Sequence, residues 1–352
     1  MQASTSDVGP DRFQNGRPQG PAVLVTKKRN LASFLGDFSD NTPLYGLLLP
    51  GVLAYRGYPI SQCQSPAFPL ASQLRSGVRV LDIRLAVVDS VLTVYHDIVS
   101  QRVTFSAVLD IVFTYLESEE GASETVVMFI KQEDGARTPE WIFSILVKEA
   151  VYTADSTRSS RWYLENRIPR LGEVRGKIVM CSRFSDVGAG WPGGDDGLGI
   201  RPTTWPDNAK DGFEWYCGSV RVQTHDWYAI PSFLAIPDKF RRCTDILLDK
   251  EGDSRDPCSS PPLAPTPTLN ISFTSASSFP FALPPMIALG CKWRCLGFTG
   301  MNERLGDWII ESLSPSYTGI ASANVKIRGW VMIDFVDLPQ DLLSLLVECN
   351  YH

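Results

Sequence analysis

Three side chains with the chemistry of a catalytic site fall within one stretch, Gly77 to His96. Asp82 and Arg84 interrupt an apolar, β-branched run of the kind found in strands covered on both faces, and His96 ends the following run. Residues two apart on a strand point to the same side, so the carboxylate and the guanidinium share a face where an unpaired charge is costly. One interpretation is that these three side chains form part of a catalytic site. The other is a structural Asp–Arg pair beside an ordinary core histidine.

The stretch itself predicts two strands joined by a tight turn at Asp89-Ser90. Strand patterns then alternate with helical patterns along the chain, which implies an α/β fold with a parallel sheet. We expect strands over 44–49, 124–131, 176–183, 219–223, 269–275 and 328–336, and helices over 69–76, 105–116, 139–151, 237–248, 302–313 and 340–347. A count of about eight strands fits a closed (β/α), or TIM, barrel.

Further charged residues fall at the ends of other predicted strands. Lys131, Arg183 and Asp334 lie at such ends, and the active site of a (β/α) barrel is built at the C-terminal ends of its strands. We therefore expect them to meet the three residues of the first stretch. Three cations around a histidine indicate a site for phosphate or another anionic oxygen group.

Composition restricts the partners. The chain has 352 residues, a net charge of −6 and a pI near 5.2, which argues against nucleic acid. No apolar run reaches the roughly 20 residues that span a bilayer, and the N-terminus has no apolar signal segment. We expect an intracellular monomer whose membrane contact is peripheral. Residues 205, 215, 227 and 293 are tryptophans in predicted loops, which either wedge into a membrane interface or pack within the loops.

The expected organisation is one domain with a tail. Residues 1–40 are polar and predict a disordered or loosely attached N-terminal tail. Residues 41–352 form the single barrel, with flexible insertions near 185–212 and 251–268, where Gly, Pro, Ser and Asp are frequent.

The eight cysteines do not form a metal motif. Cys291 and Cys295 have three residues between them, with neither a second pair nor a nearby histidine, which is poor spacing for zinc. Free thiols in a reducing compartment are expected. We predict no metal and no other cofactor.

Several of these segments together resemble a known family. They are Gly77-Val-Arg-Val-Leu-Asp-Ile-Arg84, Tyr95-His96, Glu124 to Lys131, Arg175 to Phe184, Asp226-Trp-Tyr228 and Gly329 to Phe335. They look like the X domain of phosphatidylinositol-specific phospholipase C, of the bacterial type and the fungal phospholipase-C-like phosphodiesterases. The resemblance covers about residue 40 to the end and implies a distorted TIM barrel.

The resemblance also implies a reaction. One histidine of the family takes the proton from the inositol 2-hydroxyl, which attacks phosphorus, and a second protonates the departing glycerol oxygen. By resemblance His96 is the general acid, and Arg84 contacts the phosphate. Asp82 orients His96 or Arg84. Asp334 is the nearest candidate for the carboxylate that supports the base.

The resemblance assigns the substrate contacts as well. Lys131 and Arg183 hold inositol hydroxyls, and Tyr228 packs on the ring. Arg84 stands where the calcium-dependent type has a carboxylate, so a guanidinium takes the place of the metal. The implied substrate is a phospholipid or another inositol phosphodiester.

The chain departs from the family at the first histidine. Leu49 to Pro59 contains no histidine after Pro50-Gly51, where the family has its base. His225 is an alternative base, if it is not simply a loop histidine, and His352 ends the chain. Three hypotheses remain: a slow phosphodiesterase, a catalytically dead barrel that binds inositol phosphate or phospholipid headgroups, and a sequence variant that lost the histidine segment.

Overall fold

The computed structural model describes residues 27–53, 62–152, 156–248, 266–278, 282–293, 296–314 and 326–352. It also describes two short paired strands, β1 (Phe13–Gln14) and β2 (Arg17–Pro18).

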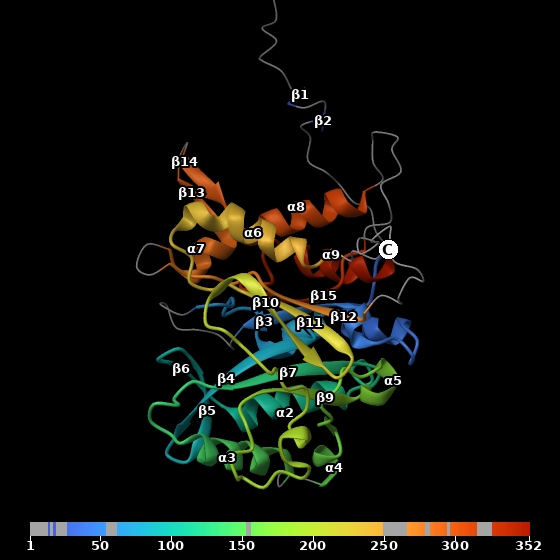
Figure 1. The fold of residues 1–352 in the computed structure, drawn as a ribbon. Helices are drawn as coiled ribbons and strands as arrows, with labels where there is room; N and C mark the ends of the chain where they lie inside the picture. Colours follow the sequence, from blue (N-terminus) through green and yellow to red (C-terminus); the bar gives the residue numbers. More distant parts are fainter. Residues whose placement is uncertain are drawn as a thin grey trace, which may run out of the picture.

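The centre of the molecule is an eleven-stranded sheet (Figure 1). Its main path runs β10-β11-β12-β15-β3-β4-β7-β9-β8, and each neighbouring pair is parallel except β10-β11. The strands of this path are β3 (Leu48–Leu53), β4 (Val80–Val88), β7 (Thr125–Gln132), β8 (Trp162–Tyr163), β9 (Lys177–Arg183), β10 (Ala209–Cys217), β11 (Val220–Asp226), β12 (Thr268–Phe273) and β15 (Gly329–Ile333). The antiparallel strands β5 (Val91–His96) and β6 (Val99–Thr104) extend β4 as a ribbon.

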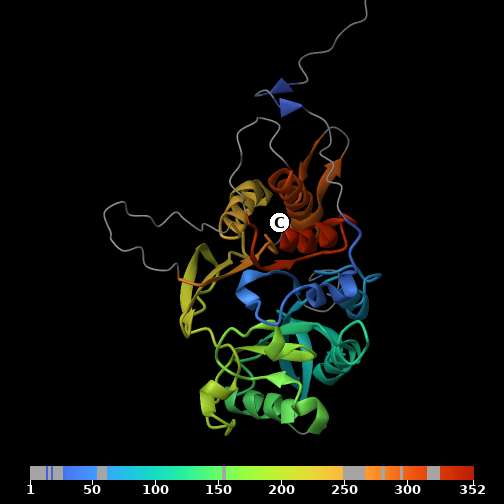
Figure 2. The same ribbon diagram turned by 90° about the vertical axis from the view of Figure 1, so that its right-hand side faces the viewer.

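Helices cover the outside of this sheet (Figures 1 and 2). α2 and α3 lie on one side, whereas α6, α7, α8 and α9 lie on the other. The helices are α1 (Leu70–Arg75), α2 (Phe105–Leu116), α3 (Glu140–Tyr152), α4 (Ser156–Ser159), α5 (Leu171–Val174), α6 (Ile236–Asp245), α7 (Pro284–Leu289), α8 (Met301–Leu313) and α9 (Leu342–Glu348). The 3-10 helices are η1 (Leu31–Asp37), η2 (Leu44–Gly46), η3 (Gly194–Gly197), η4 (Phe233–Ala235) and η5 (Cys349–Tyr351), and a separate hairpin is made by β13 (Gly290–Trp293) and β14 (Leu296–Thr299).

Alternation along the strands divides the buried side chains into two layers. Val80, Phe129 and Trp330 belong to a cluster inside the curled sheet. Their neighbours Leu81 and Met128 belong to a second cluster, which includes the apolar faces of the outer helices. Both faces of the parallel strands are therefore buried, as their near-continuous apolar sequences indicate.

The predicted α/β class and distorted TIM barrel are confirmed, but the barrel is not closed. The path ends at β8 and β10, and these two edge strands do not pair with each other in the described part of the chain. The turn at Asp89-Ser90 joins β4 to β5 as predicted, with positive φ at both residues. The strand expected at 44–49 begins only at Leu48 and continues through Pro50 and Gly51.

The expectation of a loose tail up to residue 40 is wrong for residues 27–40. η1 buries Phe34 and Leu35 completely. Arg29 pairs with Glu348 of α9 at 2.9 Å. This segment therefore packs across the end of the barrel at which the parallel strands begin.

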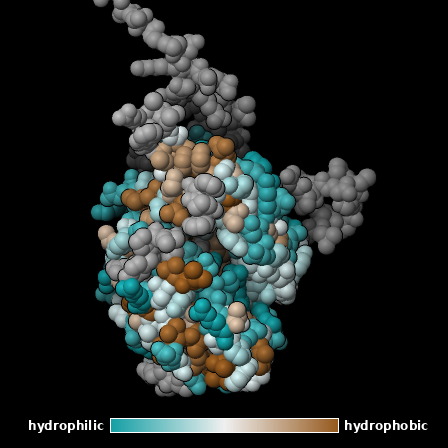
Figure 3. Space-filling model, turned by 90° about the vertical axis from the view of Figure 1, so that its left-hand side faces the viewer, coloured by the Kyte–Doolittle hydropathy of each residue, from teal (hydrophilic) through white to brown (hydrophobic). Residues whose placement is uncertain are grey.

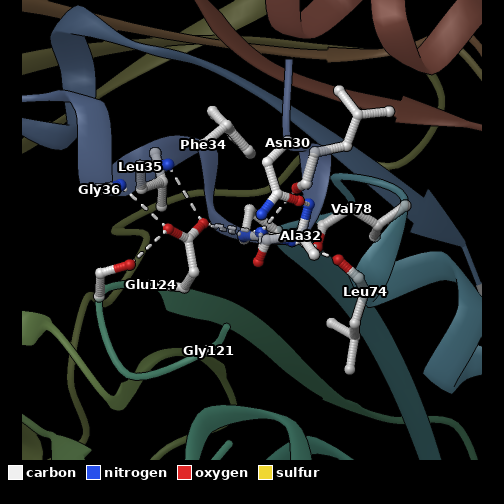
Figure 4. A network of polar contacts seen from close by, with 12 residues as sticks. Asn30, Ala32, Phe34, Leu35, Gly36, Leu74, Val78, Gly121 and Glu124 are labelled. Atoms are coloured by element: carbon white, nitrogen blue, oxygen red, sulfur yellow. Dashed lines mark hydrogen bonds and ion pairs between the residues drawn. The ribbon is translucent and has the colours of Figure 1, made fainter. Parts of the chain in front are cut away.

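A buried ion pair fixes that segment in place (Figure 4). Arg79 and Glu124 are both fully buried and lie 2.7 Å apart. The guanidinium also donates to the carbonyl oxygens of Leu31 and Ala32, while the carboxylate accepts from the backbone N–H groups of residues 35 and 36. Each charge is thus paired and hydrogen-bonded, as burial requires.

The predicted insertion at 185–212 is also packed rather than loose. Its residues Ala189, Trp191, Leu198 and Ile200 are buried, and Ile200 forms a parallel bridge with Cys181 of β9. The other predicted insertion, 251–268, lies outside the described residues as far as position 265.

Candidate active site

Three cations form a row across neighbouring strands at one end of the barrel, which we call the mouth. Arg84 of β4 is in register with Lys131 of β7, which is in register with Arg183 of β9. Residues in register on parallel strands project from the same face, here the inner one. The structure therefore brings together the three cations that the sequence analysis expected to meet.

Two carboxylates hold this row. Arg84 donates to Asp82 and to Glu133, each at 3.1 Å, and Lys131 lies 3.4 Å from Glu133. Burial alone would lower the pKa of Arg84, but the charges of Asp82, Glu133 and Asp226 outweigh it and raise that pKa. Asp82 and Arg84 do form a buried pair, yet the pair belongs to a larger charged site. Glu133 was missed in the sequence because it lies just beyond its strand.

Arg183 is held by an aromatic ring. Its guanidinium carbon lies 3.9 Å from the ring centroid of Trp205, and the Trp205 indole N–H donates to Asp226 at 2.9 Å. Burial lowers the pKa of Arg183. Trp205 packs edge-on against Phe129 and Phe273, so it fills the interior beside the open edge of the barrel and does not project as a rim wedge.

His96 and Asp334 approach the same thiol. The Sγ of Cys63 lies 3.6 Å from Nδ1 of His96, and the thiol donates a hydrogen bond to the carboxylate of Asp334. Asp334 follows β15, whereas His96 ends β5. Cys63 therefore connects the two predicted residues, although no sequence motif singled it out.

The backbone around Cys63 is anchored to the end of β15. The N–H of Phe335 donates to the carbonyl oxygen of Cys63 at 2.7 Å. The Gln64 side chain donates to the carbonyl oxygen of Ile333 and accepts from the N–H of Val336. These contacts hold the thiol beside Asp334.

Tyr228 lies at the edge of the mouth. It follows β11, is partly exposed, and donates its hydroxyl to Asp207 at 2.7 Å. That hydrogen bond, together with burial, raises the pKa of Tyr228 to about 12. Its neighbour Asp226 is buried at the end of β11 and contacts the row through Trp205.

The alternative base His225 is on the wrong face of its strand. Its Nδ1 lies 3.4 Å from the Sγ of Cys243 on α6, and its Nε2 lies 3.2 Å from the carbonyl oxygen of Lys210. Because Asp226 points inward, His225 points outward. Burial lowers the pKa of His225 to about 3. The hypothesis that His225 replaces the missing histidine is therefore wrong.

Three buried polar atoms at the mouth lack a hydrogen-bond partner among the described residues. They are Oδ1 of Asp82, Nη1 of Arg183 and Oδ1 of Asp334. An unsatisfied buried polar group costs about 1–3 kcal/mol, and such groups gather where a polar ligand completes the bonding. The mouth therefore offers both donors and acceptors to a ligand that carries anionic and hydroxyl oxygens.

Metal ligands do not cluster in the described part of the chain. No group of three or more His, Cys, Asp or Glu side chains there could hold an ion. That this protein needs no metal ion stays a prediction.

Comparison with known proteins agrees with this geometry. Residues 59–184 match the family model for phosphatidylinositol-specific phospholipase C, X domain. This segment is thus similar to the X domain of that family. The resemblance predicted from the sequence is confirmed, and the matched segment contains Asp82, Arg84, His96, Lys131 and Arg183.

One curated relative is the 1-phosphatidylinositol phosphodiesterase of Listeria monocytogenes. It is 31% identical over 157 residues, which make up 41% of this chain and 46% of the relative. The aligned region thus spans about half the length of that relative.

Solved structures of this family share the fold over most of the chain. The phosphatidylinositol-specific phospholipase C of Staphylococcus aureus superposes with a TM-score of 0.67 at 20% identity, covering 91% of this chain and 98% of that one. The Listeria monocytogenes enzyme gives 0.62 at 20% identity, covering 92% and 99%. Both solved structures share the distorted-barrel fold of this chain.

Proposed function

We propose that this chain is a metal-independent phosphodiesterase of the phosphatidylinositol-specific phospholipase C type. The observation that supports it best is the row Arg84, Lys131 and Arg183 at the mouth, with His96 at the same end. The substrate proposed is phosphatidylinositol or a related inositol phosphodiester.

Arg84 is suited to the phosphate. Its Nε and Nη1 are held by Asp82 and Glu133, so the charge is oriented before a ligand arrives. A preorganised cation stabilises the negative charge that grows on the phosphoryl oxygens, and removing such a group costs about 10²–10³ in rate. Because the guanidinium supplies this charge itself, the step needs no metal.

The other residues divide between acid catalysis and ring binding. His96 is the general acid that protonates the leaving oxygen, a role suited to a side chain that titrates near neutral pH. Arg183, with an unpartnered Nη1, and Lys131 donate to inositol hydroxyls. Tyr228 packs on the ring.

A barrel that binds without turnover is the second candidate. No histidine follows Pro50-Gly51, and His225 points away from the mouth. In this case the same cations hold an inositol phosphate or a phospholipid headgroup, but the attacking hydroxyl is not deprotonated.

The deciding experiment measures cleavage and binding side by side. Purified protein is incubated with phosphatidylinositol vesicles and a chelator, beside His96→Ala, Arg84→Ala and the exposed control Asp110→Asn. Turnover that survives chelation, is lost in the first two variants and persists in the control supports the phosphodiesterase. Binding without turnover, weakened by Arg183→Ala, supports the second candidate. Loss of activity with chelator contradicts the metal-independent reaction.

The mouth also carries an apolar rim suited to a lipid surface. The rim patch consists of Phe233 and Leu234 of η4, Leu289 of α7 and Phe298 of β14. The rings of Phe233 and Phe298 stack at 4.8 Å, and the Leu234 side chain is strongly exposed. η4 lies in the connection that follows β11, and α7 and β14 lie in the connection that follows β12. Figure 3 views this end, where apolar residues gather at the height of β13 and β14.

We therefore propose peripheral contact with phospholipid through the rim patch. No helix of the described residues is long and apolar enough to cross a membrane. Six cysteines of the described residues are free thiols, which supports the expected reducing, intracellular location. A monomer is part of the same proposal.

A further inference from the structure

The proposed reaction needs a group that accepts the proton of the attacking hydroxyl, and the further inference rests on that proposed function. Guanidinium and ammonium groups cannot accept a proton. Among the carboxylates at the mouth, Asp82 and Glu133 are both paired with Arg84, and Asp226 accepts an indole N–H. Each of these three carboxylates is therefore already engaged by a cation or an N–H donor of the protein.

Asp334 combines two features that none of these three carboxylates has together. It is buried at the end of β15, and it forms no ion pair among the described residues. Its Oδ1 has no hydrogen-bond partner there. One carboxylate oxygen is thus buried without a hydrogen-bond partner among the described residues, so it retains the capacity to accept a proton.

Cys63 fixes this carboxylate. Its thiol donates to Asp334 and lies 3.6 Å from Nδ1 of His96, and its backbone is tied to Phe335. Burial, followed by the nearby charge of Asp334, raises the pKa of Cys63 well above its usual range. The thiol therefore stays protonated at neutral pH and can donate a hydrogen bond but cannot serve as the base.

We propose that Asp334 is the general base of the reaction and that Cys63 is a positioning residue that orients it. The 2-hydroxyl of the inositol gives its proton to Asp334 while its oxygen bonds to phosphorus. The bond from phosphorus to the glycerol oxygen breaks, and that oxygen takes a proton from His96. The products are a cyclic inositol phosphate and diacylglycerol.

The electrostatic setting of Asp334 suits this role. Burial raises its pKa to about 7, although the Cys63 hydrogen bond and the charges of Lys239 on α6 and Arg84 on β4 lower it. A base is most effective when its pKa lies near the working pH. Asp334 is therefore partly ionised at neutral pH and still basic enough to take a proton.

The first test replaces the base without changing its shape. Asp334→Asn should lower turnover of phosphatidylinositol vesicles about 10²–10⁴-fold while vesicle binding stays within about threefold of wild type. Asp110→Asn, at an exposed site on α2, is the matched control. Turnover within threefold of wild type in a folded Asp334→Asn protein would overturn the assignment.

The second test separates positioning from packing. Cys63→Ala removes a donor that lowers the pKa of Asp334, so the acid limb of the kcat/KM profile should move to higher pH. Cys63→Ser keeps a donor and should restore the wild-type limb. Cys349→Ala, which removes a buried cysteine of η5, should leave the profile unchanged. An unmoved acid limb in Cys63→Ala would overturn the role of Cys63.

Failure of this inference can be told from failure of the proposed function. A wild-type chain that binds phosphatidylinositol vesicles without turnover overturns Asp334 as a base but leaves headgroup binding standing. A chain that neither binds nor cleaves them overturns the proposed function itself.

Discussion

The guanidinium of Arg183 lies over the indole ring of Trp205, 3.9 Å from its centroid. Trp205 comes from the long connection after β9 and donates to Asp226 on β11. One side chain thus orients a cation on one side of the open barrel edge and a carboxylate on the other. The barrel lacks strand pairing at this edge, and Trp205 supplies a contact in its place.

Trp205→Ala should weaken ligand binding more than it weakens the fold. Loss of a partly buried cation–π contact costs about 0.5–2 kcal/mol, which corresponds to roughly 2- to 30-fold in affinity. We expect this loss in calorimetric titration with inositol 1-phosphate, and Trp205→Phe should recover part of it. Equal affinity in wild type and Trp205→Ala would show that the ring does not position Arg183 for the ligand.

The row of cations could be predicted because strand order and strand length follow from local patterns. Lys131 and Arg183 each end an apolar run, whereas Arg84 lies within one, and parallel strands of a barrel end at the same rim. Neither Trp205 nor Cys63 could be predicted in this way. Both lie in connections without periodicity, and their places depend on contacts with residues far along the chain.

His225 shows that the position at which a strand ends decides which face of the sheet a side chain points to. The predicted strand ended at residue 223, which left His225 in a loop able to reach the mouth. β11 continues to Asp226, so strict alternation applies to both residues, and His225 faces α6. A predicted strand that ended at Asp226 would have excluded His225 as a base.

The packed segment before residue 40 was missed for a similar reason. η1 has no helical periodicity strong enough to predict it, and its burial depends on Arg79 and Glu124. Those two residues lie directly before β4 and β7, much later in the chain, so their charges gave no local signal for η1.

Glu124→Gln should strongly destabilise the protein. The substitution leaves the fully buried Arg79 without its counter-charge, and breaking a buried pair in this way costs about 3–5 kcal/mol. The change is measured as the free energy of unfolding in urea. Glu120→Gln, in the same connection but exposed and 3.7 Å from Arg75, should change it by less than about 1 kcal/mol. Similar small effects in both variants would contradict the structural role of Glu124.

His225 should make stability depend on acid pH. Its folded pKa of about 3 lies below the ordinary 6.5 because burial disfavours the charged ring. The unfolded chain therefore binds a proton below pH 6.5 that the folded chain does not. The stabilising contribution is present above pH 6.5 and falls by up to about 1.4 kcal/mol per unit as pH decreases toward 3.

The measurement compares unfolding free energies of wild type and His225→Gln between pH 7.5 and about 4. The difference between them should shrink as pH falls, because the variant lacks the titrating ring. A constant difference between wild type and His225→Gln would show that the ring is not buried in its neutral form.

Leu234→Asp should weaken binding to phosphatidylinositol vesicles. The Leu234 side chain is 77% exposed in the rim patch at the mouth, and insertion of a leucine into lipid contributes about 1.5–3 kcal/mol when it is fully buried. We expect at least about tenfold weaker binding in a sedimentation assay. Cleavage of a water-soluble inositol phosphodiester should not change, because Leu234 does not contact the charged row.

Tyr216→Asp is the matched control: Tyr216 is 57% exposed beside the β10–β11 turn, at the opposite end of the barrel. Equal losses in both variants would mean that the rim patch is not the lipid-facing surface, whereas a loss confined to Leu234→Asp would place the mouth against the membrane.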